Sequence, residues 1–282
     1  MLVRDEERSL ARCLNSACGL VDDIIVVDTG SIDRTREIAE SYRARVVNFD
    51  FSHIDFAAAR NFGLSFVTSA WIMVLDADET LDRASEPVVR QLVEEGENTG
   101  YYFERLNRRP NGEPATPDYA VRLFPNRPEY RYSGRVHETV DGAILEAGGK
   151  LRRSAVRIHH DFASDPERRR ARNLRYIEIL EEEIAADPAD YSRLDFLAAE
   201  YHQLGMFDEA AGISERIARM RPLDAQAHLH AGLYRLLYKE DQKQAKAYFT
   251  EALKIRPGYP EALSFLASLD DPGATETAST GC

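Results

Sequence analysis

Two aspartates one residue apart, Asp76 and Asp78, are the side chains in this sequence whose spacing most directly suggests chemistry. They follow the apolar run Trp71–Leu75, which predicts a buried strand. Residues i and i+2 on a strand point to the same side, so we expect both carboxylates to converge at its exposed end. Such a pair suits a hard divalent cation that carries a phosphorylated substrate. The alternative is an ordinary strand that ends in a polar turn.

Asp28 ends a second predicted strand, Asp23–Asp28, which is rich in β-branched residues. Gly30 permits a tight turn after this strand, and Ser31 or Asp33 is expected to cap the next helix. The Asp28 carboxylate can accept hydrogen bonds from a nucleoside base or ribose. The alternative is an ordinary connection between a strand and a helix.

Alternation of strands and helices in the first hundred residues is expected to position these carboxylates. The pattern predicts helices at Glu6–Gly19 and Phe56–Thr68 and a further strand at Arg45–Phe49. Units of this length imply a parallel sheet covered by helices. Ligands bind beyond the carboxyl ends of the strands in such sheets, so the aspartates that end the strands should share one ligand-binding rim.

Other polar residues can join such a site. Arg60 and Asn61 lie near a helix start and can face a phosphate or a sugar; the alternative is a surface arginine on an amphipathic helix. His137 and Glu138 follow one another in Gly-Arg-Val-His-Glu, and His159 opens the run His-His-Asp. A histidine near a diphosphate-bound metal can complete its coordination shell, and a glutamate can deprotonate an acceptor. Single histidines and glutamates are more often structural.

The pattern changes character between residues 100 and 160. Short apolar runs separated by turns containing Pro and Gly predict strands rather than another helix–strand unit. These strands are expected at Tyr101–Arg105, Ala120–Phe124, Arg131–Tyr132 and Ala155–His159. They indicate a mixed extension of the sheet.

The rest of the chain has a helical pattern that repeats. Pro188, Pro222 and Pro257 are spaced by 34 and 35 residues. This period, with small residues at the helix contacts, is typical of tetratricopeptide repeats. We therefore predict an α/β domain at 1–164, an all-α tetratricopeptide-like domain at 165–270, and a disordered tail at 271–282.

Composition narrows the function classes. A formal net charge of −12 argues against a general nucleic-acid binder. Three cysteines without metal-like spacing fit reduced thiols in a cytoplasmic protein. No stretch reads as a signal peptide or reaches the length of a membrane-spanning helix. We expect a soluble cytoplasmic protein, for which peripheral contact with a membrane stays open.

The order of these motifs resembles the family 2 glycosyltransferases with the GT-A fold, whose Rossmann-like sheet is mixed and mainly parallel. The shared motifs are Asp-Thr-Gly-Ser-x-Asp-x-Thr, Asp-Phe-x-x-Ala-Arg-Asn, Trp-Ile-x-x-Leu-Asp-Ala-Asp-Glu and Val-His-Glu, within about residues 1–160. The chain looks most like the subgroup of lipopolysaccharide core glucosyltransferases and sublancin-type peptide S-glycosyltransferases. Some members of that subgroup also carry tetratricopeptide-like helices at the C-terminal end.

The resemblance implies roles for the residues that match the family motifs. Asp28 would recognise the nucleoside of a nucleotide sugar, and Arg60 would lie near the nucleotide. Asp76 would lie near the ribose or the metal, and Asp78 would ligate Mg²⁺ or Mn²⁺ on the diphosphate. His159 would be a third metal ligand, with the neighbouring His160 as the alternative.

His137 and Glu138 would border the sugar and the acceptor, with Glu138 as the preferred base.

Family members usually open with a full strand, of which only Met1, Leu2 and Val3 are present here, so a truncated first strand is expected. The Gln-x-x-Arg-Trp motif of processive synthases is absent, and Trp71 is the only tryptophan.

The resulting hypothesis is inverting, metal-dependent transfer of a hexose, with UDP-glucose as the favoured donor. The acceptor would be a saccharide, a peptide or a lipid-linked molecule. The repeats would contact that acceptor or a protein partner, or join two subunits. One alternative is a tetratricopeptide adaptor with a catalytically silent nucleotide-sugar domain. A third hypothesis is a nucleotidyltransferase. Such an enzyme would need a glycine-rich, basic loop for a triphosphate after the first strand, whereas this segment is acidic.

Overall fold

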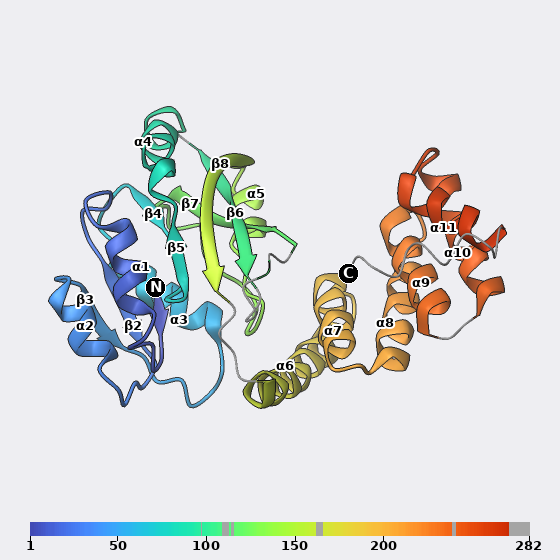
Figure 1. Cartoon of the computed structure of the whole chain (residues 1–282), viewed down its shortest axis with the longest axis horizontal. Helices are drawn as coiled ribbons and strands as arrows, with labels where there is room; N and C mark the ends of the chain where they lie inside the picture. The colour runs from blue at the N-terminus through green and yellow to red at the C-terminus, as the bar shows by residue number, and fades with distance from the viewer. Residues whose placement is uncertain (97, 109–112, 114–115, 162–165, 239–240, 271–282) are drawn as a thin grey trace. The chain divides into compact units, whose positions relative to one another are not determined.

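The computed structural model describes residues 1–282 except 97, 109–112, 114–115, 162–165, 239–240 and 271–282 (Figure 1). The chain divides into two compact units, Met1–Ser164 and Asp165–Cys282. They are called here the N-terminal unit and the helical unit. The predicted disordered tail at 271–282 lies outside the described residues.

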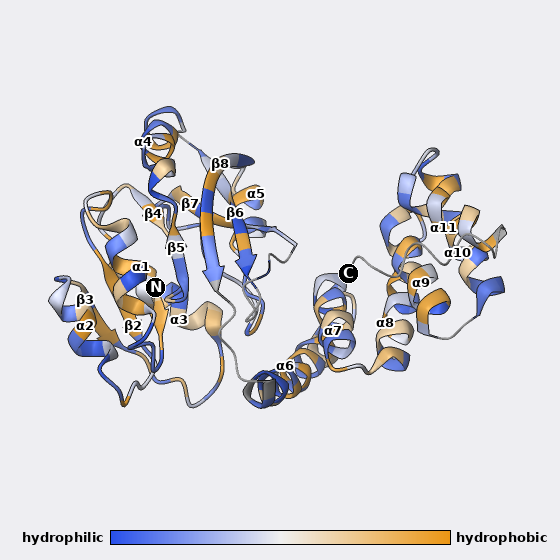
Figure 2. Cartoon of the chain, in the orientation of Figure 1, coloured by the Kyte–Doolittle hydropathy of each residue, from blue (hydrophilic) through white to orange (hydrophobic). Residues whose placement is uncertain are grey.

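A small parallel sheet opens the N-terminal unit. Its strands, in spatial order, are β1 (Leu2–Val3), β2 (Ile25–Asp28) and β3 (Arg45–Asn48). Helices α1 (Leu10–Ala17) and α2 (Thr35–Ser41) connect them. Figure 2 shows hydrophobic residues along β2, in agreement with its continuous β-branched sequence. The predicted parallel arrangement is confirmed for these strands.

A second, mixed sheet holds the remaining strands of this unit. Its spatial order is β4-β7-β6-β8-β5. The strands are β4 (Trp71–Met73), β5 (Glu79–Leu81), β6 (Thr99–Arg108), β7 (Asp118–Pro125) and β8 (Lys150–Asp161). The strands after residue 100 do form a mixed sheet, as predicted, but it is a separate sheet and not an extension of the first one.

The prediction that Trp71–Leu75 joins the parallel sheet is wrong. The strand β4 runs antiparallel to β7, with Ile72 opposite Phe124. It also ends at Met73, so Asp76 and Asp78 lie in the turn between β4 and β5 rather than on a strand. The rule that residues i and i+2 share a side therefore does not apply to this pair.

Helices and an irregular segment complete the N-terminal unit. The helix α3 (Phe56–Leu64) begins where the Asp55 carboxylate accepts a hydrogen bond from the Ala58 N–H at 2.7 Å. The sequence analysis did not predict the helices α4 (Glu86–Glu95) and α5 (Asp141–Glu146). The strand predicted at Arg131–Tyr132 is wrong, because these residues have irregular backbone.

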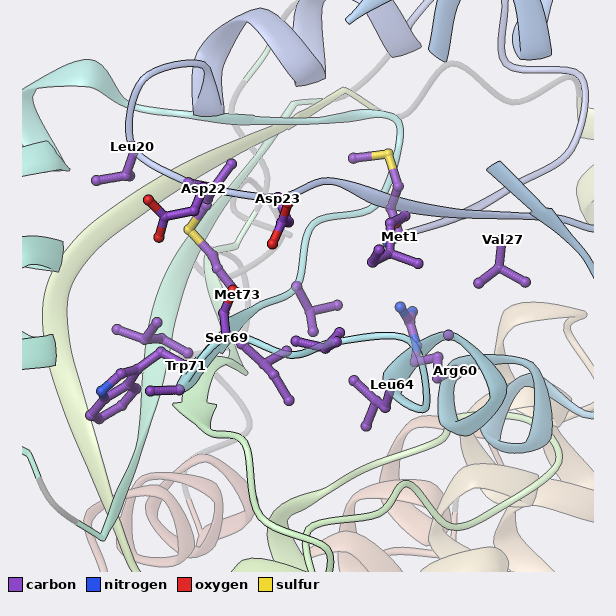
Figure 3. Close-up of a pocket in the computed structure, with 18 of the residues that line it drawn as sticks. Met1, Leu20, Asp22, Asp23, Val27, Arg60, Leu64, Ser69, Trp71 and Met73 are labelled. Atoms are coloured by element: carbon purple, nitrogen blue, oxygen red, sulfur yellow. The ribbon is translucent and has the colours of Figure 1, made fainter. Parts of the chain in front are cut away.

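An apolar cavity of about 340 Å³ lies between the start of β2 and the strand β4 (Figure 3). Leu20, Leu64 and Trp71 contribute to its lining, with Arg60 towards one end. Beside it β1 has only two residues, and among the described strands it pairs only with β2. The Met1 nitrogen is partly buried at this point and donates a hydrogen bond to the Ile25 carbonyl at 2.8 Å.

The described part of the helical unit consists of consecutive α-helices. They are α6 (Pro166–Ala186), α7 (Tyr191–Gln203), α8 (Phe207–Met220), α9 (Ala225–Tyr238), α10 (Gln242–Ile255) and α11 (Pro260–Asp270). Ala210 and Ala245 are fully buried at equivalent positions of α8 and α10. A Cβ atom on Gly232 would lie 2.6 Å from the Phe249 ring, so this contact requires glycine. The predicted helical repeat is confirmed.

Candidate active site

The carboxylate of Asp76 is held between two arginines. Its Oδ1 lies 2.9 Å from Arg60 Nη2, and its Oδ2 lies 2.7 Å from Arg122 Nη2. Burial alone would raise the pKa of Asp76, but Arg122 and Arg60 outweigh it and hold this pKa well below its usual range. Asp76 is therefore an anion whose two oxygens are both engaged by guanidinium groups.

Arg60 links Asp76 to Glu138. The Arg60 Nε lies 2.5 Å from Glu138 Oε1, and both side chains are only 11% exposed. Arg60 comes from α3, whereas Glu138 comes from the segment between β7 and α5. The structure thus brings together three residues that the sequence analysis assigned to one site from separate motifs.

The segment that carries Glu138 is a closed loop with unusual backbone. Ser133 and Thr139 exchange backbone hydrogen bonds of 2.9 and 3.1 Å across it. His137 has a left-handed backbone with φ of 51°, which is strained for a residue with a Cβ atom. The Phe56 N–H donates to the Arg135 carbonyl at 2.8 Å, which attaches the loop to the start of α3. Tertiary contacts therefore maintain a conformation that the local sequence does not favour.

Sequence reasoning did not find Arg122 and gave no role to Glu79. Glu79 is fully buried, pairs with Arg122, and accepts a hydrogen bond from the Asp76 N–H at 3.0 Å. Its pKa is raised by burial, against the opposing effect of Arg122. The available signal was an arginine inside an otherwise apolar predicted strand, Ala120–Phe124, where an unpaired charge is costly.

Cys13 supports the same turn from α1. Its thiol donates a hydrogen bond to the Asp76 carbonyl at 3.2 Å. Burial raises the pKa of this thiol to about 12, so it stays protonated. Cys13 and Cys18 are both free in the structure, and the reduced state of the three cysteines stays a prediction.

Asp78 lies beside a histidine, but this histidine is His160. The distance from His160 Nε2 to Asp78 Oδ2 is 3.3 Å. Burial would lower the pKa of His160, but the hydrogen bond with Asp78 outweighs it and raises the pKa. His159 pairs with Thr80 in the sheet, and successive residues of a strand face opposite sides. The geometry therefore favours the alternative ligand, His160, over the expected His159.

The donor set near Asp78 is small. Among the described residues, no group of three or more His, Cys, Asp or Glu side chains is arranged to hold a metal ion. Asp78 is 42% exposed and supplies one carboxylate, and His160 supplies one imidazole. This pair fits a cation that takes its remaining ligands from water and from substrate phosphates, which is how Mg²⁺ is commonly bound. Asp76 is less suited to this role, because its oxygens are already paired.

Asp28 ends β2, as predicted, and its side chain is almost fully buried. Its Oδ1 accepts hydrogen bonds from the N–H groups of Gly30 and Ser31 at 3.2 and 2.9 Å. Its Oδ2 lies 3.1 Å from Arg36 Nη1. The carboxylate thus shapes the turn after β2, and a role in nucleoside recognition stays a prediction.

Asn61 contacts the main chain of Tyr132. Its side-chain Oδ1 accepts a hydrogen bond from the Tyr132 N–H at 2.8 Å, and its Nδ2 donates to the Tyr132 carbonyl at 2.9 Å. In this structure, its contacts are those of a residue that anchors the main chain of Tyr132.

No helix in the described parts of the chain is long and apolar enough to cross a membrane.

Comparison with known proteins places these observations in a family. The chain is 39% identical over 145 residues to a TPR repeat-containing protein of Synechococcus elongatus, covering 51% of this chain and 35% of that protein. It is 23% identical over 237 residues to the SPbeta prophage-derived glycosyltransferase SunS of Bacillus subtilis, covering 81% of this chain and 54% of SunS. The chain thus spans between about a third and about half of these relatives.

A solved structure of S. aureus TarS 1–349 in complex with UDP-GlcNAc matches with a TM-score of 0.50 and 13% identity, covering 90% of this chain and 89% of that solved chain. This likeness concerns the fold alone and agrees with the predicted GT-A-like α/β domain followed by helices. The model of the family described as glycosyl transferase family 2 matches residues 1–156, more than half of the chain. The chain therefore belongs to glycosyl transferase family 2.

Proposed function

We propose that the N-terminal unit transfers a hexose, with glucose favoured, from a nucleoside diphosphate sugar to an acceptor with inversion at the anomeric carbon. The observation that carries this proposal is the cluster in which Arg60 joins Asp76 to Glu138. In a member of this family, such a cluster would hold Asp76 beside the donor and present the Glu138 carboxylate to the acceptor. The acceptor class is a saccharide, a peptide or a lipid-linked molecule.

The donor would bind beside Asp76 and Asp78. A Mg²⁺ or Mn²⁺ ion held by Asp78 and His160 would offset the charge that develops on the departing diphosphate. Arg60 and Arg122 keep Asp76 ionised and fix its orientation, so little reorganisation is needed when substrate charge develops. Asp28 is proposed to contact the nucleoside, and His137 to border the sugar.

Glu138 is the proposed base. Its Oε1 is held by Arg60, whereas its Oε2 makes no hydrogen bond with the described residues. This oxygen can take the proton of the acceptor nucleophile as that atom bonds to the anomeric carbon. The bond from the anomeric carbon to the diphosphate oxygen breaks with its electron pair leaving on the diphosphate. A single displacement of this kind inverts the configuration.

We also propose that the helical unit binds a protein partner or the acceptor, or joins two copies of the chain. A groove of about 510 Å³ lies among α7, α8 and α9, and its lining includes His202, Tyr234 and Tyr238. Aromatic residues of this kind are common anchors in protein interfaces. We further propose that the protein is located in the cytoplasm and that it can contact a membrane peripherally.

The substitution Asp78→Asn should lower metal-dependent sugar transfer by about 100-fold or more, because the amide lacks the charge that holds the cation. Transfer rates measured across a range of Mn²⁺ concentrations test this. The control is Glu86→Gln, which removes a carboxylate of similar exposure from α4 and should leave the rate unchanged. A rate for Asp78→Asn equal to that of the unmodified protein would show that Asp78 does not hold the cation.

The substitution Glu138→Gln should lower kcat by about 10²- to 10⁴-fold while the KM for the donor changes little. The amide oxygen can still accept the hydrogen bond from Arg60, but the group cannot take a proton. Steady-state kinetics with the donor varied separate the two parameters. The control is Glu104→Gln, which alters a carboxylate paired with Arg157 on the sheet. An unchanged kcat for Glu138→Gln would exclude Glu138 as the base.

A further inference from the structure

Tyr132 is held firmly beside the carboxylate cluster. Asn61 binds its main chain through two hydrogen bonds of 2.8 and 2.9 Å. Its ring packs edge-on against Phe124, with centroids 6.2 Å apart, and the Arg60 guanidinium carbon lies 5.4 Å from its centroid. The position of the ring is therefore fixed on several sides.

The hydroxyl of Tyr132 has no hydrogen-bond partner among the described residues, although the residue is only 8% exposed. A buried hydroxyl without a partner is unfavourable, and phenylalanine would fill the same space without that cost. Packing alone therefore does not account for a tyrosine here. Buried polar groups that the protein leaves unsatisfied point to a water molecule or a ligand.

The surroundings of this hydroxyl are those of the proposed donor site. The charges that act on it belong to Arg60, Arg122, Glu138 and Asp76. Burial raises the pKa of Tyr132 to about 12, so the group stays protonated near neutral pH and can donate a hydrogen bond. A second buried polar atom of the cluster, Arg122 Nε, also has no partner among the described residues.

Tyr132 also borders the cavity described above. Tyr132 and Arg60 both contribute to its lining, and Figure 3 shows the Arg60 side chain extending from its helix among the other lining residues. The carboxylates of Asp76 and Glu138 are already paired with arginines. The partner that completes the cluster is therefore expected to bring its own acceptor oxygens, as phosphates and sugars do.

We propose that Tyr132 is a substrate-binding residue whose hydroxyl donates a hydrogen bond to an oxygen of the nucleotide sugar bound beside Asp76. This assignment rests on the proposed function. The competing explanation is a structural water molecule that satisfies the hydroxyl in the absence of any substrate role.

The test compares Tyr132→Phe with Tyr130→Phe in the full-length chain. Tyr130 is a matched control, because it is also buried but its hydroxyl is bonded to Asn98. For each protein, calorimetry with UDP-glucose and Mn²⁺ gives the donor Kd, steady-state kinetics give KM and kcat, and thermal unfolding gives Tm.

Tyr132→Phe should weaken donor binding and raise the donor KM by about tenfold, with an unchanged or higher Tm. Tyr130→Phe should show the reverse, a lower Tm with an unchanged donor Kd. If Tyr132→Phe binds the donor as tightly as the unmodified protein, the assignment is wrong while the proposed function stands. If Tyr132→Phe has a lower Tm but an unchanged donor Kd, the hydroxyl binds a structural water molecule, and the assignment is again wrong. If the unmodified protein binds no nucleotide sugar across a UDP, GDP and dTDP panel, the proposed function and this assignment both fail.

Discussion

The buried ion pairs around Asp76 are the interaction on which the rest of the N-terminal unit depends. Asp76 lies in the turn between β4 and β5, Arg60 on α3, and Arg122 on β7. Taking these charges out of water is costly unless each one keeps its partners in good geometry. Removing one partner of such a group typically costs about 3–5 kcal/mol. Three separate elements must therefore be in place before the ionised Asp76 is stable.

These ion pairs also make the contribution of Asp76 to the stability of the fold depend on pH. Because the pKa of Asp76 is depressed in the folded protein, its contribution to stability is present above the pKa of the unfolded chain. That contribution is lost as the pH falls towards the folded value. Arg60 extends the constraint to Glu138, and so to the loop that holds His137 in its left-handed conformation. A strained loop at this position is consistent with a functional site maintained by its surroundings.

Local patterns were sufficient to predict most elements of the fold. The β-branched run before Asp28, the helix that begins after Asp55 and the 34-residue period of the helical unit each follow from short-range preferences. The partner of β4 could not be predicted in this way, because it is a strand about fifty residues later. Among the described strands β4 pairs with β7 alone, and an apolar run contains no information about that choice.

For the candidate site, the sequence predicted some of the residues but not their arrangement. The motifs around Arg60, Asp76 and Glu138 pointed to one region, yet no local rule shows that Arg60 bridges the other two. The distinction between His159 and His160 depends on the register of β8 against β5, which single residues do not reveal. Arg122 was missed because the residues that compensate its charge, Asp76 and Glu79, are distant in the sequence.

Calorimetric titration of the full-length chain with nucleoside diphosphate sugars, with and without Mn²⁺, tests the central claim most directly. The account predicts that at least one such sugar binds one-to-one and that binding weakens when Mn²⁺ is removed. The same titration of Arg60→Gln should show a large loss of affinity, because this change leaves Asp76 and Glu138 without their shared cation. Absence of binding by every nucleotide sugar, in a protein shown to be folded, would contradict the account.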